Sequence, residues 1–216
     1  MIINVCGLRD AATIAEVAAL GADWIGLVFN QNSSRNVSMI ATNAGIMPDR
    51  PSIAASSSSL APARVGVFCN ATAQDVITRV VNFKLSILQF DGSEPPTLLR
   101  NLRRTLANGV KFMKTIRLTQ PDDFEQCRPY IDCADYFLFD IAATQPLPSQ
   151  LALFNDYQEA VPFLLGGNIG PDDADVLARY RHSLFAGLSL DRQFETAPAI
   201  KDVGLLRHFI DTLHNN

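Results

Sequence analysis

Short apolar runs recur along the chain and alternate with segments that suit helices. The first run, Ile2–Val5, leads into Cys6 and then Gly7, which permits a tight exit from a strand. Asp10 is placed to cap the Ala-rich segment 11–20, which Gly21 would end. Further strands are predicted at 24–29, 64–68, 85–90, 111–116, 136–140, 162–165 and 184–188, and further helices at 73–81, 97–106, 121–129, 150–157, 172–180 and 205–213.

This alternation of strand and helix predicts a parallel sheet. A doubly wound sheet competes with a barrel, but it would normally carry a Gly-rich phosphate loop after its first strand, and the sequence contains no GxGxxG. Eight short units in 216 residues favour an α/β fold that is a single (β/α)8 TIM barrel over residues 1–216. The segment 38–63 carries three prolines and a serine run, so we expect a short helix and a flexible loop in place of the second helix.

Composition narrows the class of protein. Hydrophobic residues make up 48% and charged residues 19%, which predicts a sizeable core. A net charge of -4 argues against a binder of nucleic acid or of anionic membranes. No apolar run reaches the length of a membrane span, and the start resembles a strand rather than a signal peptide, so we expect a cytoplasmic protein. The four cysteines lack CxxC spacing and are predicted to be thiols, with Cys69 and Cys133 as packing residues.

In such a barrel, reacting groups come from the carboxyl ends of the strands. Cys6 occupies the first of these ends, although a buried cysteine is more often a packing residue. Asp140 follows four apolar residues, where an unpaired carboxylate is costly, and the segment after it does not look helical, which favours a functional role. A thiol and a carboxyl group across a barrel mouth form a base and acid pair that moves protons next to a carbonyl or imine without a cofactor.

Other strand ends carry weaker candidates. Arg35 lies in a polar loop and could be a solvated charge, and Gly166-Gly167 could be a plain turn or a phosphate site on backbone amides. Asp91 and Ser189 also lie at strand ends. The three histidines lie near the last helices, away from these ends, and no HExxH, Cys/His cluster or carboxylate cluster has metal spacing, so no metal is predicted.

Over nearly its whole length, the sequence resembles the phosphoribosylanthranilate isomerase family of tryptophan biosynthesis. The resemblance rests on ordered motifs that are weak singly and specific together. They are Val5-Cys6-Gly7-Leu8-Arg9-Asp10, Gly21-Ala22-Asp23-Trp24-Ile25-Gly26, Ser33-Ser34-Arg35-Asn36-Val37, Arg64-Val65-Gly66-Val67-Phe68 with Asn70, Gln89-Phe90-Asp91-Gly92-Ser93-Glu94, Asp135–Asp140, Pro162–Leu165 with Pro171, and Phe194-Glu195 with Pro198 and Lys201-Asp202.

The resemblance implies a (β/α)8 barrel that catalyses the Amadori rearrangement of N-(5-phosphoribosyl)anthranilate. It implies that Asp140 is the general acid, that Cys6 as thiolate is the general base, and that Arg35 holds the anthranilate carboxylate. The phosphate would rest on backbone amides after strands seven and eight, which places Gly167, Asn168 and Ser189 among the substrate-binding residues. The partner implied is a small phosphorylated substrate, with no cofactor, and the protein is expected to be a monomer or a homodimer.

Several positions depart from the family pattern. Asp91 stands where the family has His, Asn168 where it has the second glycine, and Ser189 where it has Asp. The loop 141–148 contains no glycine, and 191–193 replaces small residues with Asp-Arg-Gln. Two alternatives therefore stay open beside the isomerase: an enzyme for another phosphosugar-amine, and a degenerate paralogue that keeps the barrel but is catalytically impaired.

Overall fold

The computed structural model describes residues 1–37, 61–142 and 146–215, and eight of its strands form a closed barrel. They are β1 (Ile2–Cys6), β2 (Trp24–Phe29), β3 (Ala63–Phe68), β4 (Ile87–Phe90), β5 (Lys111–Leu118), β6 (Tyr136–Ile141), β7 (Phe163–Gly167) and β8 (Phe185–Leu190). Every neighbouring pair is parallel, and β1 closes the barrel against β8 with Asn4 opposite Ser189. The predicted barrel is confirmed.

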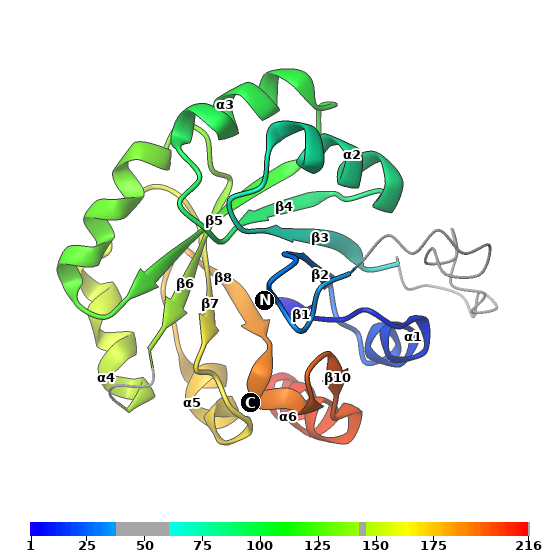
Figure 1. Cartoon of the computed structure of the whole chain (residues 1–216). Coiled ribbons are helices and arrows are strands. Elements are labelled where there is room, and N and C mark those ends of the chain that lie inside the picture. Colours follow the sequence, from blue (N-terminus) through cyan, green and yellow to red (C-terminus); the bar gives the residue numbers. More distant parts are fainter. Residues whose placement is uncertain (38–60, 143–145, 216) are drawn as a thin grey trace.

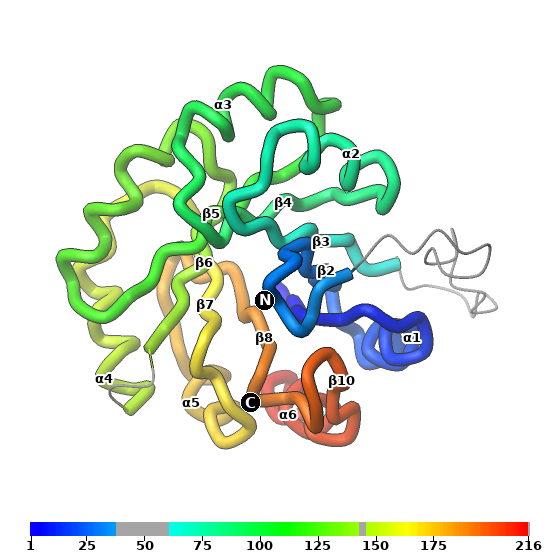
Figure 2. The backbone as a smooth tube through the Cα atoms, in the orientation of Figure 1, coloured from blue at the N-terminus to red at the C-terminus, as the bar shows by residue number. Residues whose placement is uncertain are grey.

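Helices surround the strands on the outside of the barrel (Figure 1). They are α1 (Ala11–Ala19), α2 (Ala73–Phe83), α3 (Pro96–Thr105), α4 (Leu147–Ala152), α5 (Ala174–Arg179) and α6 (Val203–Asn215), with the 3-10 helices η1 (Pro121–Tyr130), η2 (Leu153–Asp156), η3 (Pro171–Asp173) and η4 (Arg192–Phe194). Asp10 caps α1 as predicted, since its side chain accepts a hydrogen bond from the Thr13 amide at 2.8 Å. The tube in Figure 2 shows the chain circling the barrel once, from α1 through α3 and α5 to α6.

Three local predictions need correction. The helix predicted at 150–157 begins earlier, at Leu147 directly after Pro146, and ends as a 3-10 turn. The helix predicted at 121–129 is a 3-10 helix that contains Pro129. A small antiparallel hairpin of β9 (Glu195–Ala197) and β10 (Ile200–Lys201) follows β8 and was not predicted. The flexible loop predicted at 38–63 lies mostly outside the described residues.

The barrel carries one apolar core inside and another beneath its helices. Mostly aliphatic side chains fill the interior, among them Val65, Ile87, Met113 and Leu164. The outward side chains of the strands pack under the helices, where Phe139 and Phe163 form edge and stacked contacts with Phe154. These two layers hold the strands rigidly, so the carboxyl ends of the strands are fixed in position.

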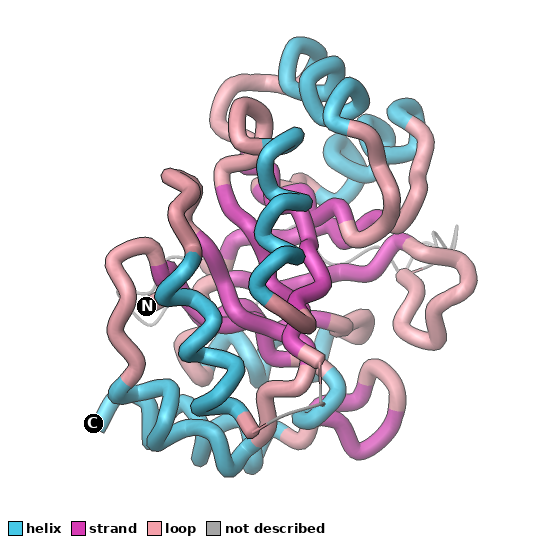
Figure 3. The backbone as a smooth tube through the Cα atoms, turned by 90° about the vertical axis from the view of Figure 1, so that its left-hand side faces the viewer, coloured by secondary structure: helices cyan, strands magenta, loops and turns pink. Residues whose placement is uncertain are grey.

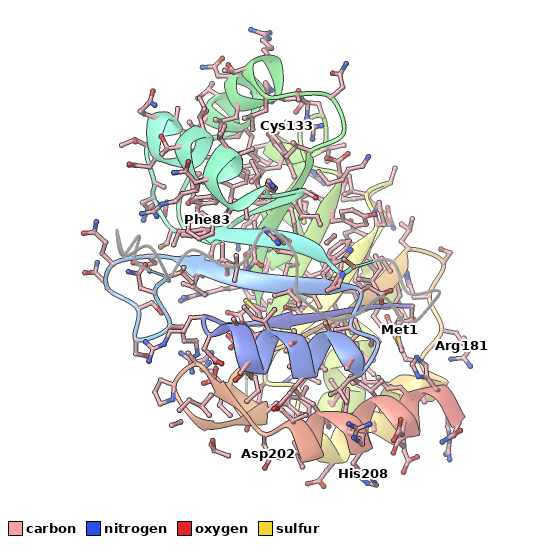
Figure 4. All side chains as sticks on the ribbon, turned by 90° about the vertical axis from the view of Figure 1, so that its right-hand side faces the viewer. Met1, Phe83, Cys133, Arg181, Asp202 and His208 are labelled. Atoms are coloured by element: carbon pink, nitrogen blue, oxygen red, sulfur yellow. The ribbon has the colours of Figure 1, made fainter. Side chains whose placement is uncertain are left out.

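Both chain ends lie on the same side of the molecule, while the β9–β10 hairpin lies away from them (Figure 3). His208 lies on the outer surface of α6 (Figure 4), and His214 is exposed as well, away from the strand ends as predicted. Within the described part of the chain, no helix combines the length and the apolar character needed to cross a membrane.

Candidate active site

Cys6 ends β1 at the mouth of the barrel. The next residue, Gly7, has φ +83°, and its amide donates to the Gly26 carbonyl at 3.0 Å, so the chain turns sharply away and leaves the thiol in place. Gly26 makes room for that thiol, because a Cβ on residue 26 would lie 2.8 Å from the Cys6 Sγ. Burial raises the pKa of Cys6, and the nearby Asp191 carboxylate raises it further. The free protein therefore holds Cys6 mainly as a thiol.

Asp140 lies near the end of β6. Its carboxyl group is 3.8 Å from the exposed Arg117 guanidinium, and about a third of its side chain is exposed (32%). Burial raises the pKa of Asp140, the negative charge of Asp91 adds to the increase, and Arg117 opposes it. These effects favour the protonated carboxyl group, which is the form that a general acid needs.

One cavity of about 280 Å³ brings the predicted residues together. Cys6 and Asp140 both line it, from strands on different sides of the barrel. The other predicted residues that line it are Arg35, Asp91, Gly167 and Ser189. The cavity therefore joins a thiol, a carboxyl group and a guanidinium group in one space, as a proton-transfer site for an anionic substrate requires.

Cys69 also lines this cavity and is only half-buried, so the prediction that it is a packing residue is wrong. It directly follows β3, and its side chain lies at the mouth of the barrel. Cys133 is buried among apolar residues, as predicted, and all four cysteines are free thiols.

A buried ion pair fixes the backbone on both sides of Asp91. Lys114 donates to the Phe90 and Gly92 carbonyls at 3.0 and 2.7 Å, and it lies 3.7 Å from Glu94, whose side chain is 1% exposed. Glu94 in turn accepts from the amides of Asn70 and Gly92 at 2.6 and 3.0 Å. In the sequence, Glu94 stood out only as part of a family motif, and its pairing with Lys114 was not predicted.

Ser189 lies deeper than the predicted phosphate loop. It is buried, and its Oγ accepts a hydrogen bond from the Asn4 side chain at 2.9 Å. Its hydroxyl group thus belongs to the floor of the 280 Å³ cavity.

A second cavity of about 630 Å³ adjoins the first at Asp140 and Gly167. Arg117 and Arg192 line it, together with Asn168 and Gln193, whose side chains are hydrogen-bonded to each other at 2.8 Å. The amide of Asn168 donates to the Ile141 carbonyl at 3.1 Å, so this amide is engaged within the protein. The polar groups that this cavity offers to an anion are therefore chiefly side chains, above all the two arginines.

Arg35 does not stand alone at the mouth. Its guanidinium group binds the Glu195 carboxylate through Nε and Nη2, and Asp191 lies 3.5 Å away. Sequence reasoning named Glu195 only as part of a family motif. Among the residues that the structure describes, no group of three His, Cys, Asp or Glu side chains could hold a metal ion.

The comparisons with known proteins agree on one family. The family model described as N-(5'phosphoribosyl)anthranilate (PRA) isomerase matches residues 3–212. The N-(5'-phosphoribosyl)anthranilate isomerase of Parabacteroides distasonis is 36% identical over 217 positions, which cover 99% of this chain and 93% of the relative. That of Phocaeicola vulgatus is 32% identical and covers 99% of this chain and 98% of its own.

Solved structures support the fold. The phosphoribosyl anthranilate isomerase of Thermotoga maritima superposes with a TM-score of 0.79 at 20% identity, over 100% of both chains. A phosphoribosyl anthranilate isomerase in complex with reduced 1-(o-carboxyphenylamino)-1-deoxyribulose 5-phosphate gives 0.78 at 20% identity, again over 100% of both chains. With the family model spanning nearly the whole sequence, the chain belongs to the N-(5'-phosphoribosyl)anthranilate isomerase family.

Proposed function

We propose that this protein catalyses the Amadori rearrangement of N-(5'-phosphoribosyl)anthranilate to 1-(o-carboxyphenylamino)-1-deoxyribulose 5-phosphate in tryptophan biosynthesis. The observation that carries this proposal is the shared cavity of Cys6 and Asp140 in a chain of this family. The reaction needs one acid and one base and no change of oxidation state overall, which these two side chains can supply.

Asp140 is the general acid of the first step. It donates its proton to the ribose ring oxygen while the C1'–O bond breaks, and the nitrogen lone pair forms the C=N bond of a protonated Schiff base. The raised pKa of Asp140, caused first by burial, favours the protonated form that this step consumes. Gly167 packs against the carboxyl group and helps to fix its position.

Cys6 is the general base of the second step. Its thiolate removes the C2' proton, the C–H electrons form a C1'=C2' bond, and the C=N electrons return to nitrogen. The resulting enolamine takes up a proton at C1' and loses the proton of its C2' hydroxyl group, which leaves the ketone. Atoms and charges balance without a cofactor.

Two arginine positions suit the two anionic ends of the substrate. Arg35, at the first cavity, would bind the anthranilate carboxylate, and Asp91 and Ser189 line the same cavity. The phosphate would enter the second cavity beside Gly167 and Asn168, where Arg192 supplies a side-chain ligand in place of the missing glycine amides.

The test is complementation of a tryptophan auxotroph that lacks this isomerase, followed by steady-state kinetics on the purified variants. The wild-type gene should restore growth, and Cys6→Ala and Asp140→Asn should abolish it, with losses in kcat of about 10²–10⁴-fold. The matched controls Cys133→Ala and Asp172→Asn change the same residue types away from the cavity and should keep growth.

Failure of the wild-type gene to restore growth, together with no turnover of the purified protein, would refute the proposal. That result would favour an enzyme for another phosphosugar-amine or an impaired paralogue. Arg192→Ala should raise KM by roughly tenfold or more with a smaller change in kcat, since it removes a charged ligand that binds substrate and transition state alike.

A further inference from the structure

The β9–β10 hairpin places two charged side chains directly against the candidate site. Glu195 begins β9 and pairs with Arg35, and Lys201 ends β10 and pairs with Asp191. Each of the four groups lies within 4 Å of at least one group of opposite charge, so two cations and two anions form a neutral cluster. We call these four residues the hairpin cluster.

Glu195 holds one edge of the Arg35 guanidinium group. Arg35 Nε donates to the two carboxylate oxygens at 2.9 and 3.0 Å, and Nη2 donates to Oε2 at 2.5 Å. The Arg35 side chain is 19% exposed and that of Glu195 is 5% exposed. A forked contact of this kind fixes the plane of the guanidinium group as well as its position. The hydrogen bonds from Arg35 and Lys201 lower the pKa of Glu195 against the opposing effect of burial, so Glu195 is ionised.

Lys201 holds Glu195 from the other side. Its ammonium group is completely buried, and it donates to Glu195 Oε1 at 2.9 Å, to the Asp191 carbonyl at 3.1 Å and to Asp191 Oδ1 at 3.3 Å. Two carboxylates and a carbonyl oxygen thus surround this buried ammonium group. The geometry therefore gives Glu195 one position, and through it gives Arg35 one orientation.

The hairpin cluster also reaches the residue next to the candidate base. A Cβ on Gly7 would lie 2.8 Å from the Arg35 side chain, 2.9 Å from Asp191 Oδ1 and 3.3 Å from Glu195 Oε1. The turn after Cys6 is thus packed directly on the cluster, with no space between them. The orientation of Arg35 and the turn that presents the thiol are parts of one packed unit.

We propose that Glu195 is a positioning residue that orients Arg35 for the carboxylate of the substrate, and that Lys201 holds Glu195 in place. This inference rests on the proposed function, and it assigns a role to the hairpin that follows the barrel. Glu195 occupies the Nε edge of Arg35, so the substrate carboxylate binds the opposite, Nη1 side of the guanidinium group. Pre-orienting a flexible arginine lowers the entropy cost of binding and leaves the chemical step unchanged.

A double-mutant cycle in KM and kcat tests this role. Glu195→Gln keeps the size of the side chain and removes its charge, and we expect KM to rise about tenfold while kcat changes less than about threefold. In an Arg35→Ala background the same change should alter KM less than about twofold, because Glu195 then has no arginine to orient. Equal effects in both backgrounds would overturn the proposal, since they would mean that Glu195 only stabilises the fold.

Two further variants guard against a folding defect. Glu195→Asp keeps the charge next to Lys201 but withdraws the carboxylate by one methylene group, so it should reproduce the KM effect at wild-type stability. The control Glu125→Gln removes an exposed carboxylate on the outside of the barrel and should leave KM unchanged. A wild-type KM in Glu195→Asp would contradict the proposal.

The same double-mutant cycle can be measured without turnover, as the affinity of each variant for reduced 1-(o-carboxyphenylamino)-1-deoxyribulose 5-phosphate in a calorimeter. If the wild-type protein binds this compound but does not turn over substrate, the proposed function fails, and the binding cycle alone decides the role of Glu195. A tenfold loss of affinity in Glu195→Gln that disappears in the Arg35→Ala background supports the role. Additive losses, or no binding by the wild-type protein, overturn it.

Discussion

Gly167 is the residue whose replacement separates backbone strain from displacement of Asp140, the proposed general acid. It has φ +87°, a conformation that side chains with a Cβ rarely adopt. A Cβ at this position would lie 2.2 Å from Asp140 Oδ1, 2.6 Å from the Ile141 carbonyl oxygen and 2.8 Å from the Ile141 amide nitrogen. Gly167→Ala therefore has to move both the carboxyl group and the end of β6.

Two effects set the size of the loss. The positive φ costs roughly 1–2 kcal/mol for a residue with a Cβ. Relieving the overlap with Ile141 adds about 1–3 kcal/mol, as overpacking does in other tightly packed sites. Asp140 also has to shift by about 1 Å to restore a normal contact distance, and a displacement of that size in a catalytic group lowers the rate about 10²-fold.

Gly21→Ala is the matched control. Gly21 has nearly the same φ, +86°, but a Cβ there would meet nothing within 4 Å. We expect Gly21→Ala to lower Tm by roughly 2–8 °C and to leave kcat unchanged, and Gly167→Ala to lower Tm further and kcat about 10²-fold. Thermal unfolding and steady-state kinetics measure the two effects. Equal Tm losses with an unchanged kcat in Gly167→Ala would refute the role of this contact in fixing Asp140.

Three further predictions follow from the charged and aromatic groups. Asp91→Asn removes a negative charge that raises the pKa of both Cys6 and Asp140. Both limbs of the pH profile of kcat/KM should therefore move to lower pH, and an unchanged profile would contradict this prediction. Lys114→Met leaves the buried Glu94 carboxylate without its cation and should lower the free energy of unfolding, measured in urea, by about 3–5 kcal/mol. The double variant with Glu94→Gln should recover part of this loss, and no recovery would argue against a stabilising Lys114–Glu94 ion pair. Phe154→Ala removes the ring that stacks on Phe163 and should lower the free energy of unfolding by about 3–5 kcal/mol in the same assay. A loss under about 1 kcal/mol would mean that the aromatic layer between the strands and the helices is loosely packed.

The sequence was sufficient to predict the barrel because its signals are local. Each buried strand is a short apolar run bounded by turn residues, and that pattern needs no knowledge of distant contacts. Cys6 and Asp140 were singled out as candidates for the same reason, since each directly follows or ends such a run. Their meeting in one cavity then follows from the closure of the barrel.

The charged clusters could not be predicted in this way. Arg35 and Glu195 are 160 residues apart, and Lys114 lies within β5 whereas Glu94 lies in the loop after β4. Nothing local to a lysine or a glutamate indicates that the fold will bury it against a distant partner. Ser189 lines the cavity, but its hydrogen bond with Asn4 joins β1 to β8 across the closure of the barrel, a matter of strand register that a single sequence leaves open.

The order of the two proton transfers follows from the charges around the two groups. The mechanism needs Cys6 without its proton and Asp140 with it, yet a thiol ordinarily holds its proton to higher pH than a carboxyl group. Burial raises the pKa of Asp140, which helps, but burial also raises the pKa of Cys6, which opposes the reaction. The reactive form of the free protein is therefore a minor one. A transfer from Asp140 relieves this difficulty, because it creates a protonated Schiff base whose positive charge favours a thiolate beside it. In the proposed mechanism Asp140 therefore acts first, and the cation that it generates makes Cys6 a competent base.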